Sequence, residues 1–277
     1  MFKLLKNLIK EPMFVIGSVL FLTTILAGLI GPYLYAAVPD GGPYERPGSM
    51  YWLGTDNLGQ DYVALLLRGL QNSLYVGFMA GVIATTIGTL VGLFAGFKGG
   101  IIDDILNMFT NLFIVIPSFV VLVLVSASWS GGRSLTLIAV LIGLTTWPWT
   151  ARSVRAQAAS LRGRDHISLA RINGASNLQI IFKHILPYLA SYVFMVFIMQ
   201  VASGILSESA ISMIGLGPIG DSPSLGVILN TAKNQSAITY GYWWGIFPAA
   251  IVITVIVFAL YLLNNSMEGV FNPRLRK

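Results

Sequence analysis

Long apolar stretches alternate with shorter polar segments along most of the chain. A helix that crosses the hydrocarbon core of a bilayer needs about 20 mostly apolar residues. Six stretches meet this requirement: 13–35, 73–97, 105–127, 134–151, 188–213 and 245–264. The fourth is interrupted by Trp147-Pro148-Trp149, and a proline there is expected to kink a helix. The pattern predicts an all-α integral membrane protein with an N-terminal segment over 1–12 and a single transmembrane domain over 13–277.

The basic residues predict how these spans are oriented. Three connections are long, at about 36–72, 152–187 and 214–244. With the N-terminus inside the cell, thirteen of the 17 lysines and arginines fall on inner segments. Cytoplasmic loops carry the excess of Lys and Arg in membrane proteins. Both termini and the 152–187 segment are therefore expected in the cytoplasm, and the other two long loops outside.

Composition agrees with a membrane location and excludes several classes of site. Charged residues make up only 10% of the chain, against about 25% in soluble domains. The net charge of +6 follows the topology and forms no clustered basic face, so nucleic-acid binding is not expected. The chain has no cysteine, which excludes disulfides and thiolate metal sites. The apolar run after the basic Met1–Lys10 segment is too long for the core of a cleaved signal peptide.

No catalytic or cofactor-binding motif is found. The stretch Gly96–Gly100 lacks the GxxxxGK[ST] spacing of a phosphate-binding loop. His166 and His184 are the only histidines, and no cluster with metal-ligand spacing or nucleophile–base arrangement surrounds them. The sequence therefore predicts a protein that is not an enzyme and binds no metal or cofactor. If ATP drives its activity, another chain must bind the nucleotide.

The second predicted span carries a stripe of small residues. Five glycines share one face of a helix with 3.6 residues per turn: Gly77, Gly81, Gly88, Gly92 and Gly96. Small residues let membrane helices approach closely. The stripe is interpreted as a packing seam within the subunit, or as a seam that slides or lines a pathway during transport.

The inner connection is too polar to cross the membrane and too regular to be disordered. Ile167, Ala170, Gly174 and Leu178 recur at helical spacing, and Asn173-Gly174 is a turn signal. Ser176 and Gln179 have the spacing of a capping box that begins a second helix. That helix is expected to end near Leu186, because the residue before a proline avoids the helical region. Two short helices with a glycine elbow suit docking into a partner's groove or lying on lipid headgroups.

One motif in this segment consists of Ser168, Leu169, Ala170, Gly174 and Ala175, followed by His184, Ile185, Leu186 and Pro187. It resembles the EAA loop of binding-protein-dependent ABC importer permeases. The family often has Glu and Ala where this chain has Ser168 and Leu169. The resemblance implies a coupling helix, inserted between the fourth and fifth of six transmembrane helices, that docks into a cytoplasmic ATPase.

Further segments are similar to dipeptide and oligopeptide permeases, specifically the C-type subunit. Leu53–Asp61 resembles LGTDxxGRD with Gln60 in place of Arg, and Glu208–Gly217 resembles ESxxSFLGLG. The remaining matches are Pro223–Gly226, with Leu225 where the family has Trp, then Trp243-Trp244 before Pro248, and Asn272–Leu275. They follow the family's order and cover most of the chain after about residue 50.

The resemblance implies a function and a set of partners. It implies a permease of a prokaryotic plasma-membrane importer that moves a solute delivered by an external binding protein. A second, homologous permease subunit and two ATPase subunits, which would hold ATP and Mg²⁺, complete the complex. Members import peptides, nickel or short oligosaccharides. Peptide is the first expectation and oligosaccharide the second.

Polar residues at the outer side allow two interpretations. Asp56 and Asn57 are turn formers that either hold a compact loop or receive the binding protein. Glu208 lies late in the fifth span beside Ser209, and a carboxylate near the membrane core should face protein or water. Glu208 and Ser209 therefore either form an internal hydrogen-bonded group or line the solute pathway. Aromatic residues at the outer ends suit sugar stacking or an interfacial belt: Tyr51, Trp52, Trp243 and Trp244.

Two other functional classes were considered. An ion-coupled secondary transporter would need ionisable groups or broken helices at mid-membrane, and the predicted spans are nearly free of charge. A membrane-embedded enzyme would need a polar catalytic cluster, and none is found. The importer permease is the leading hypothesis.

Overall fold

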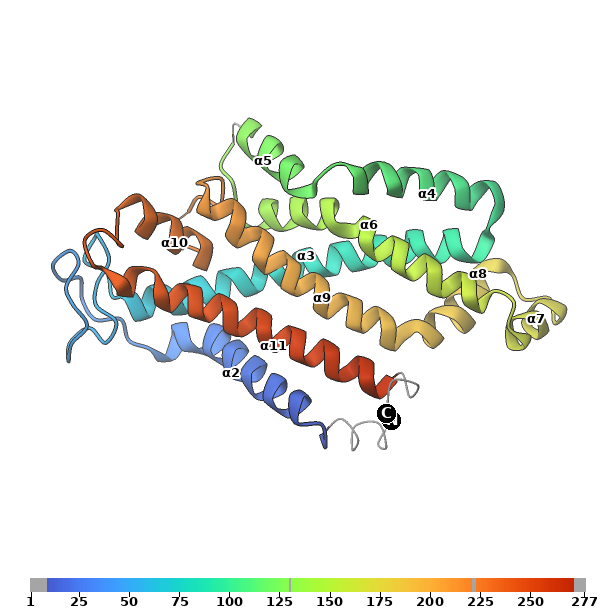
Figure 1. Ribbon diagram of the computed structural model, residues 1–277, viewed down its shortest axis with the longest axis horizontal. Helices are drawn as coiled ribbons and strands as arrows, with labels where there is room; N and C mark the ends of the chain where they lie inside the picture. Colours follow the sequence, from blue (N-terminus) through green and yellow to red (C-terminus); the bar gives the residue numbers. More distant parts are fainter. Residues whose placement is uncertain (1–8, 130, 221–222, 272–277) are drawn as a thin grey trace.

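The computed structural model describes residues 9–129, 131–220 and 223–271. They form helices that run mostly along one long axis (Figure 1). In chain order these are α2 (Pro12–Leu34), α3 (Tyr62–Lys98), α4 (Gly100–Val115), α5 (Ser118–Ser128), α6 (Leu135–Leu161), α7 (Asp165–Ile172), α8 (Asn177–Ile180), the π-helix η1 (Ile181–Ile185), α9 (Leu186–Met213), α10 (Leu225–Asn234), the 3₁₀-helix η2 (Trp243–Gly245) and α11 (Phe247–Phe271). Most of the predicted 1–12 segment, and the whole Asn272–Leu275 motif, lie outside the described residues.

The all-helical membrane prediction is confirmed at the level of apolar helices. Four described helices are long and apolar enough to cross a membrane: Pro12–Leu34, Tyr62–Lys98, Asn177–Met213 and Trp243–Gly269. The bent pair α4 and α5 makes a fifth if it counts as one span. α6 is not among them, although Figure 1 shows it running lengthwise between α4 and α9.

The two ends of the bundle carry different connections. At one end α3 passes into α4, and the short helices α7 and α8 project beyond the bundle (Figure 1). At the opposite end lie the loop 35–61 and α10. These are called the α7 end and the α10 end.

The loop before α3 is shorter than the predicted 36–72, because α3 begins at Tyr62. Asp61 caps the helix by accepting a hydrogen bond from the Val63 N–H at 3.0 Å. Tyr62, Leu66 and Leu70 are then buried in the main core. The predicted span 73–97 therefore covers only the later part of a 37-residue helix.

The predicted third span, 105–127, is not one helix. It breaks at Ile116-Pro117 into α4 and α5, which are bent by 73°. Ile116 has extended backbone angles, φ −82° and ψ 119°, as expected for a residue that precedes proline. The single-helix prediction overlooked Pro117.

In α6 the opposite is found, because Pro148 does not break the helix. The helix is continuous from Leu135 to Leu161, so the predicted interruption is wrong and the predicted end at 151 is too early. Thr145 and Thr146 donate hydrogen bonds to carbonyls of the preceding turn, both at 2.9 Å. Those carbonyls belong to Leu141 and Ile142, whereas Pro148 leaves the Leu144 carbonyl without its N–H donor. The helix continues there because Pro148 is buried in the packed bundle.

The inner connection is shorter than the predicted 152–187, because α6 continues into it and α9 begins within it. The capping box is confirmed: Ser176 Oγ accepts from the Gln179 N–H at 3.3 Å, and Gln179 Oε1 accepts from the Ser176 N–H at 2.9 Å. The predicted helix end near Leu186 is wrong. The Leu186 N–H donates to the Ile181 carbonyl across a π-turn, and Pro187 sits in the first turn of α9, where its missing N–H is tolerated.

α4 is fastened to α6 near the α7 end. Arg155 of α6 donates to both carboxylate oxygens of Asp103, at 2.5 and 2.7 Å. Arg152 donates to the side-chain Oδ1 of Asn111 at 2.6 Å. These bonds hold α4 alongside α6.

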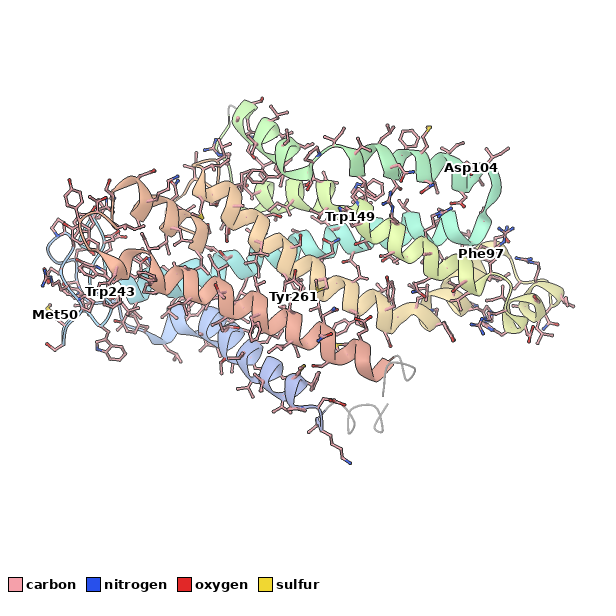
Figure 2. The ribbon with its side chains drawn as sticks, in the orientation of Figure 1. Met50, Phe97, Asp104, Trp149, Trp243 and Tyr261 are labelled. Atoms are coloured by element: carbon pink, nitrogen blue, oxygen red, sulfur yellow. The ribbon has the colours of Figure 1, made fainter. Side chains whose placement is uncertain are left out.

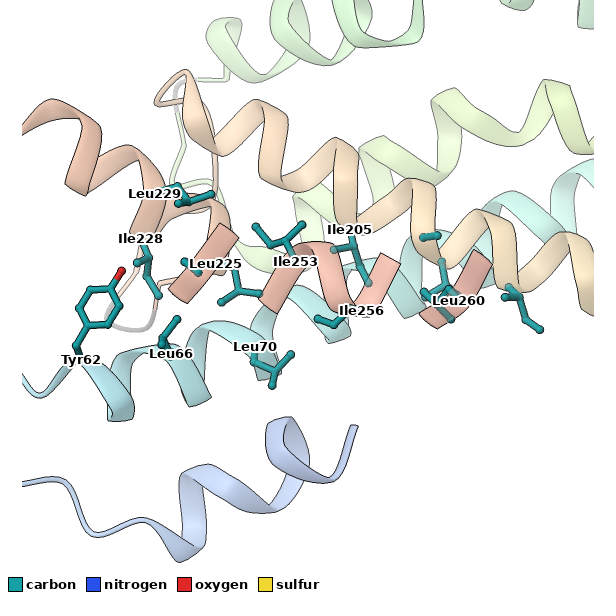
Figure 3. Packing of buried hydrophobic residues seen from close by; sticks show 14 of the residues in the cluster. Tyr62, Leu66, Leu70, Ile205, Leu225, Ile228, Leu229, Ile253, Ile256 and Leu260 are labelled. Atoms are coloured by element: carbon teal, nitrogen blue, oxygen red, sulfur yellow. The ribbon is translucent and has the colours of Figure 1, made fainter. Parts of the chain in front are cut away.

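The main core lies between α3, α9, α10 and α11 (Figure 3). Its residues include Tyr62, Leu66, Leu70, Ile205, Leu225, Ile228, Leu229, Ile253, Ile256 and Leu260. A second cluster near the α7 end joins Leu93 and Phe97 of α3 to Ile167 of α7 and Ile181 of η1. α10, which the sequence did not predict, is thus an integral part of the fold.

Candidate functional site

A groove of about 580 Å³ runs along one face of the bundle. Side chains of α6, α9 and α11, together with Ser118 of α5, line it. Figure 2 labels Trp149 on α6 and Tyr261 on α11, the helices on either side of α9. The lining extends along α9 from Tyr192 to Ser207, so it is the candidate transport surface.

The groove is polar but nearly uncharged. Six of its residues are serine or threonine: Ser118, Thr146, Thr150, Ser153, Ser203 and Ser207. Gln200, Asn264 and two tyrosines add further hydrogen-bonding groups, and Glu268 is the only charged lining residue. The Asn264 Oδ1 atom is buried and has no hydrogen-bond partner among the described residues. Such a surface suits a solute that is itself polar and hydrogen-bonding.

Gln200 fixes the floor of the groove. Its Nε2 donates to Thr150 Oγ1 at 2.7 Å and to the Thr146 carbonyl at 3.3 Å, which joins α9 to α6. Gln200, Ser203 and Ser207 are three and four residues apart and share one face of α9. This polar face was not predicted from the sequence, although its helical spacing is visible in the fifth apolar stretch.

Glu208 and Ser209 are both buried, and neither lines the groove. Glu208 is 0% exposed and is enclosed by three serines. Its Oε1 accepts from Ser212 Oγ at 2.6 Å and from Ser224 Oγ, and its Oε2 accepts from Ser73 Oγ at 3.2 Å. Hydrogen-bond donors of this kind are what a buried carboxylate requires.

The Glu208 group fastens α10 to the bundle. Ser224 is the N-cap of α10, and Ser73 Oγ also accepts from the Leu225 N–H at 3.1 Å. A Cβ atom on Gly226 would lie 2.7 Å from the Ser209 Cα, so only glycine permits this approach of α10 to α9. The motifs Glu208–Gly217 and Pro223–Gly226, separate in the sequence, therefore meet at one carboxylate.

Arg133, in the loop before α6, is hydrogen-bonded to the segment between α9 and α10. Its Nε donates to the Gly217 carbonyl at 3.0 Å, and its backbone carbonyl accepts from the Ile219 N–H at 2.7 Å. Asn230 and Lys233 of α10 both donate to the Met213 carbonyl, at 2.7 and 2.8 Å. The carboxyl end of α9 and the segment after it are thus hydrogen-bonded by side chains from the loop before α6 and from α10.

The motif Leu53–Asp61 forms a folded loop. Asp56 Oδ1 accepts from the Leu58 and Gln60 N–H groups, both at 2.8 Å. Asp61 Oδ2 accepts from the Tyr35 hydroxyl at 2.7 Å. Burial and this hydrogen bond raise the pKa of Tyr35 to about 12, which keeps the phenol protonated as a donor.

Two of the four outer aromatic residues donate hydrogen bonds to backbone carbonyls of the chain. Trp244 is buried and donates from Nε1 to the Thr55 carbonyl at 3.1 Å, while Tyr51 is buried and donates to the Pro39 carbonyl at 2.7 Å. Trp52 and Trp243 are exposed. Trp244 thus links the loop 35–61 to η2.

The glycine stripe lies where α3 is closest to its neighbours. Gly77 and Gly81 face Val201 and Ile205 of α9, while Gly88, Gly92 and Gly96 face α6. A Cβ atom on Gly92 would lie 2.6 Å from the Ala151 carbonyl oxygen. None of the five glycines lines the groove.

The residues of the EAA-like motif form a projection at the α7 end. Ala170 is buried beside Ile167 in the second core cluster, which fixes α7 to the bundle, and Ala175 packs against it. Ser168, Leu169, His184 and Pro187 are exposed. Gly174 has φ +79°, a left-handed conformation that favours glycine, and it lies in open space.

Apolar side chains on this projection remain uncovered. Leu169 is 60% exposed, Ile172 80% and Leu178 56%. His166 stacks on Tyr188, with ring centroids 5.9 Å apart. Among the described residues, no group of three or more His, Cys, Asp or Glu side chains is placed to hold a metal ion.

Comparisons with known proteins identify the family to which this chain is similar. Residues 88–277 match the family described as binding-protein-dependent transport system inner membrane component. The chain is 32% identical over 245 residues to the oligopeptide transport system permease protein OppC of Mycobacterium tuberculosis, which covers 88% of this chain and 83% of the relative. It is 29% identical to the dipeptide transport system permease protein DppC of Bacillus subtilis, over 98% of this chain and 85% of the relative.

A solved structure shares the fold. A chain of the MetNI methionine ABC transporter, in an inward-facing conformation, superimposes with a TM-score of 0.58 at 21% identity. The match covers 74% of this chain and 96% of that chain.

Proposed function

Because the chain belongs to the family of binding-protein-dependent transport system inner membrane components, we propose that it imports peptides as one of two permease subunits. It is a membrane-spanning permease of an ABC importer, and the peptide substrate is the proposed part. The observation that carries the proposal is the polar, nearly uncharged groove along α6, α9 and α11. Peptides present amide and carbonyl groups along their whole length, which such a lining can match.

The groove is proposed as one wall of the solute pathway. Hydroxyl and amide groups facing lipid would lack hydrogen-bond partners. A second, homologous permease subunit facing this groove would cover it and complete the pathway. Glu208 and Ser209 then support the wall from behind.

Six crossings are proposed, with α4 and α5 as one bent crossing and α6 as another. α6 carries few charges before Arg152 and lies between α4 and α9 (Figure 1). The α7 end, where most Lys and Arg residues of the connections gather, is proposed as the cytoplasmic end, with both termini on that side. The α10 end then faces outward, toward the solute-binding protein.

The projection at the α7 end is proposed as the contact with the ATPase. Leu169, Ile172 and Leu178 expose apolar surface that an aqueous environment disfavours. The left-handed Gly174 sets the angle between α7 and the helix that continues into α9. Movement of a docked ATPase would therefore reach the pathway wall through α9. This chain itself would bind no nucleotide; ATP and Mg²⁺ belong to the ATPase subunits.

Oligosaccharide remains the second candidate. Stacking on sugar rings needs exposed aromatic faces, and of the four outer residues only Trp52 and Trp243 offer them. The named relatives are peptide permeases, which favours peptide.

The test is reconstitution of the complex that co-purifies with the tagged chain in mild detergent. A second permease and ATPase subunits are expected in that complex. With its binding protein added, the complex should take up labelled di- and oligopeptides only with ATP, and unlabelled peptides should compete where oligosaccharides do not. A matched complex with a hydrolysis-deficient ATPase is the control. Uptake without ATP would overturn the importer mechanism, and competition by oligosaccharides alone would overturn the peptide assignment.

A further inference from the structure

A second cavity, separate from the groove, lies at the α10 end. It encloses about 280 Å³ between the loop 35–61, the start of α3, α10 and η2. Pockets that hold whole small molecules usually measure about 300–1,000 Å³. The cavity is therefore of a size to receive one side chain rather than a peptide.

The walls of this cavity are held in place by hydrogen bonds between distant segments. Tyr62 donates to the Gly245 carbonyl at 2.6 Å, and Tyr44 donates to Gln235 Oε1 at 2.5 Å. The bond from Trp244 to the Thr55 carbonyl closes a third side. The cavity is thus formed before any partner binds.

The lining combines aromatic rings with one carboxylate. The Tyr44 and Tyr242 rings are stacked, with centroids 4.3 Å apart, and Trp244 packs edge-on against Tyr242 at 5.6 Å. Asp56 is the only acidic residue in the lining, and no lysine or arginine lines the cavity. Burial, Tyr242 and the charge of Asp56 together raise the pKa of Tyr44.

No cation within the described chain neutralises this carboxylate. The single salt bridge among the described residues joins Arg155 to Asp103, far along the bundle. Asp56 Oδ1 accepts two backbone amides of its own loop, which orient the carboxylate without balancing its charge. Aromatic faces beside an uncompensated carboxylate form a favourable environment for an ammonium or guanidinium group.

We propose that this cavity receives a lysine or arginine side chain of the solute-binding protein when that protein docks on the α10 end. The inference rests on the proposed function, which places the α10 end outside and requires a docked binding protein. A cationic side chain seated in a preformed aromatic pocket is the kind of anchor that dominates protein interfaces. Asp56 and the Tyr44–Tyr242 pair then act as the receptor for that anchor.

The experiment uses the complete transporter in lipid nanodiscs with its own solute-loaded binding protein. The readout is ATP hydrolysis as a function of binding-protein concentration. Asp56→Asn keeps the oxygen that caps the loop and removes the charge, so the half-saturating concentration should rise about tenfold. Asp56→Lys should raise it further by repelling the anchor. Asp40→Asn, an exposed acid of the same loop outside the cavity, is the matched control and should leave it unchanged.

Three outcomes would contradict the inference. Equal half-saturation for Asp56→Asn and the unsubstituted complex would overturn the inference. So would a change in the dependence on solute concentration with no change in the dependence on binding protein, because the cavity would then serve the solute. If no binding protein stimulates the unsubstituted complex, the proposed function fails, and this inference fails with it. Melting temperatures of both Asp56 variants verify that the loop remains folded.

Discussion

The two ends of the bundle are built in opposite ways. At the α10 end, Glu208, Arg133 and Asp61 each collect several hydrogen bonds from different segments. At the α7 end, the α7–α8 projection rests on a few buried aliphatic side chains and leaves Leu169 and Ile172 exposed. The same long helices, α3 and α9, run between the two ends. The segments of the α10 end are held together by hydrogen bonds within the chain, whereas the α7 end leaves apolar surface uncovered.

The contrast indicates which end the chain itself fixes and which end leaves surface for a partner. Buried polar groups that are fully satisfied specify one arrangement of the segments that meet there. The α7 end has a short helix joined by a left-handed glycine, with apolar side chains outward, and its proposed role is to pass the movement of a bound partner to α9. Four substitutions test this contrast between the two ends.

Glu208→Ala should have the largest effect. It removes the acceptor shared by Ser73, Ser212 and Ser224, leaving buried hydroxyls unsatisfied at about 1–3 kcal/mol each. The free energy of unfolding should fall by about 3 kcal/mol or more, measured from the melting transition in detergent. Glu208→Gln, which keeps one acceptor oxygen, should lose less. Equal stability of Glu208→Ala and the unsubstituted chain would show that the α10 end does not depend on this carboxylate.

Gly174→Val should affect coupling more than folding. A β-branched residue at φ +79° is strained by about 1–3 kcal/mol and would change the angle between α7 and the helix that continues into α9. ATP-driven uptake in vesicles should drop at least about tenfold, with insertion and melting temperature nearly unchanged. Gly163→Val is the control, since Gly163 lies in the same connection, in open space, without a positive φ. Normal uptake by Gly174→Val would refute the elbow's role.

The pair Leu169→Ser and Ile172→Ser tests the exposed apolar surface. Each replacement removes apolar area worth about 1–2 kcal/mol when buried against a partner. Less ATPase should therefore remain bound to the permease during purification, while the permease alone should melt as before. Ile167→Ser, in the same helix but fully buried, should instead destabilise α7 itself. Undiminished ATPase retention by the double variant would place the contact elsewhere.

Ser176→Ala should have the smallest effect. It removes the capping box that begins α8 and should cost about 1 kcal/mol of local helix stability. Amide hydrogen exchange at the start of α8 should accelerate, with little change in uptake. Ser160→Ala is a suitable comparison, because the Ser160 hydroxyl bonds only to the Gln157 carbonyl within α6. Unaltered exchange would mean that tertiary packing alone holds this helix end.

Proline positions show how far the sequence could predict the fold. The rule that residues before proline leave the helical region holds at Ile116 and fails at Leu186. At Pro148 the helix continues, although the ring removes the N–H that would reach the Leu144 carbonyl, because Pro148 is buried within the packed bundle. Whether a proline breaks, bends or joins helices depends on compensating bonds and packing that the local sequence does not specify.

Some parts of the candidate site could be predicted from the sequence and others could not, for a similar reason. The glycine elbow and its capping box are local features, so residue types and spacing were sufficient to find them. The groove surface of Gln200, Ser203 and Ser207 is also periodic, but helical periodicity alone does not say which neighbours face it. The serines around Glu208 come from three segments and are brought together only by packing.

Hydropathy, charge and motif order along the chain were enough to identify the membrane-spanning helical class, the family and the polar inner connection. Only the packing of the helices showed that Glu208 fastens α10, that the glycine stripe contacts α6 and α9, and that Asp56 faces an aromatic cavity. Each of these depends on residues far apart in the chain, whose contacts are set by how the helices pack against one another.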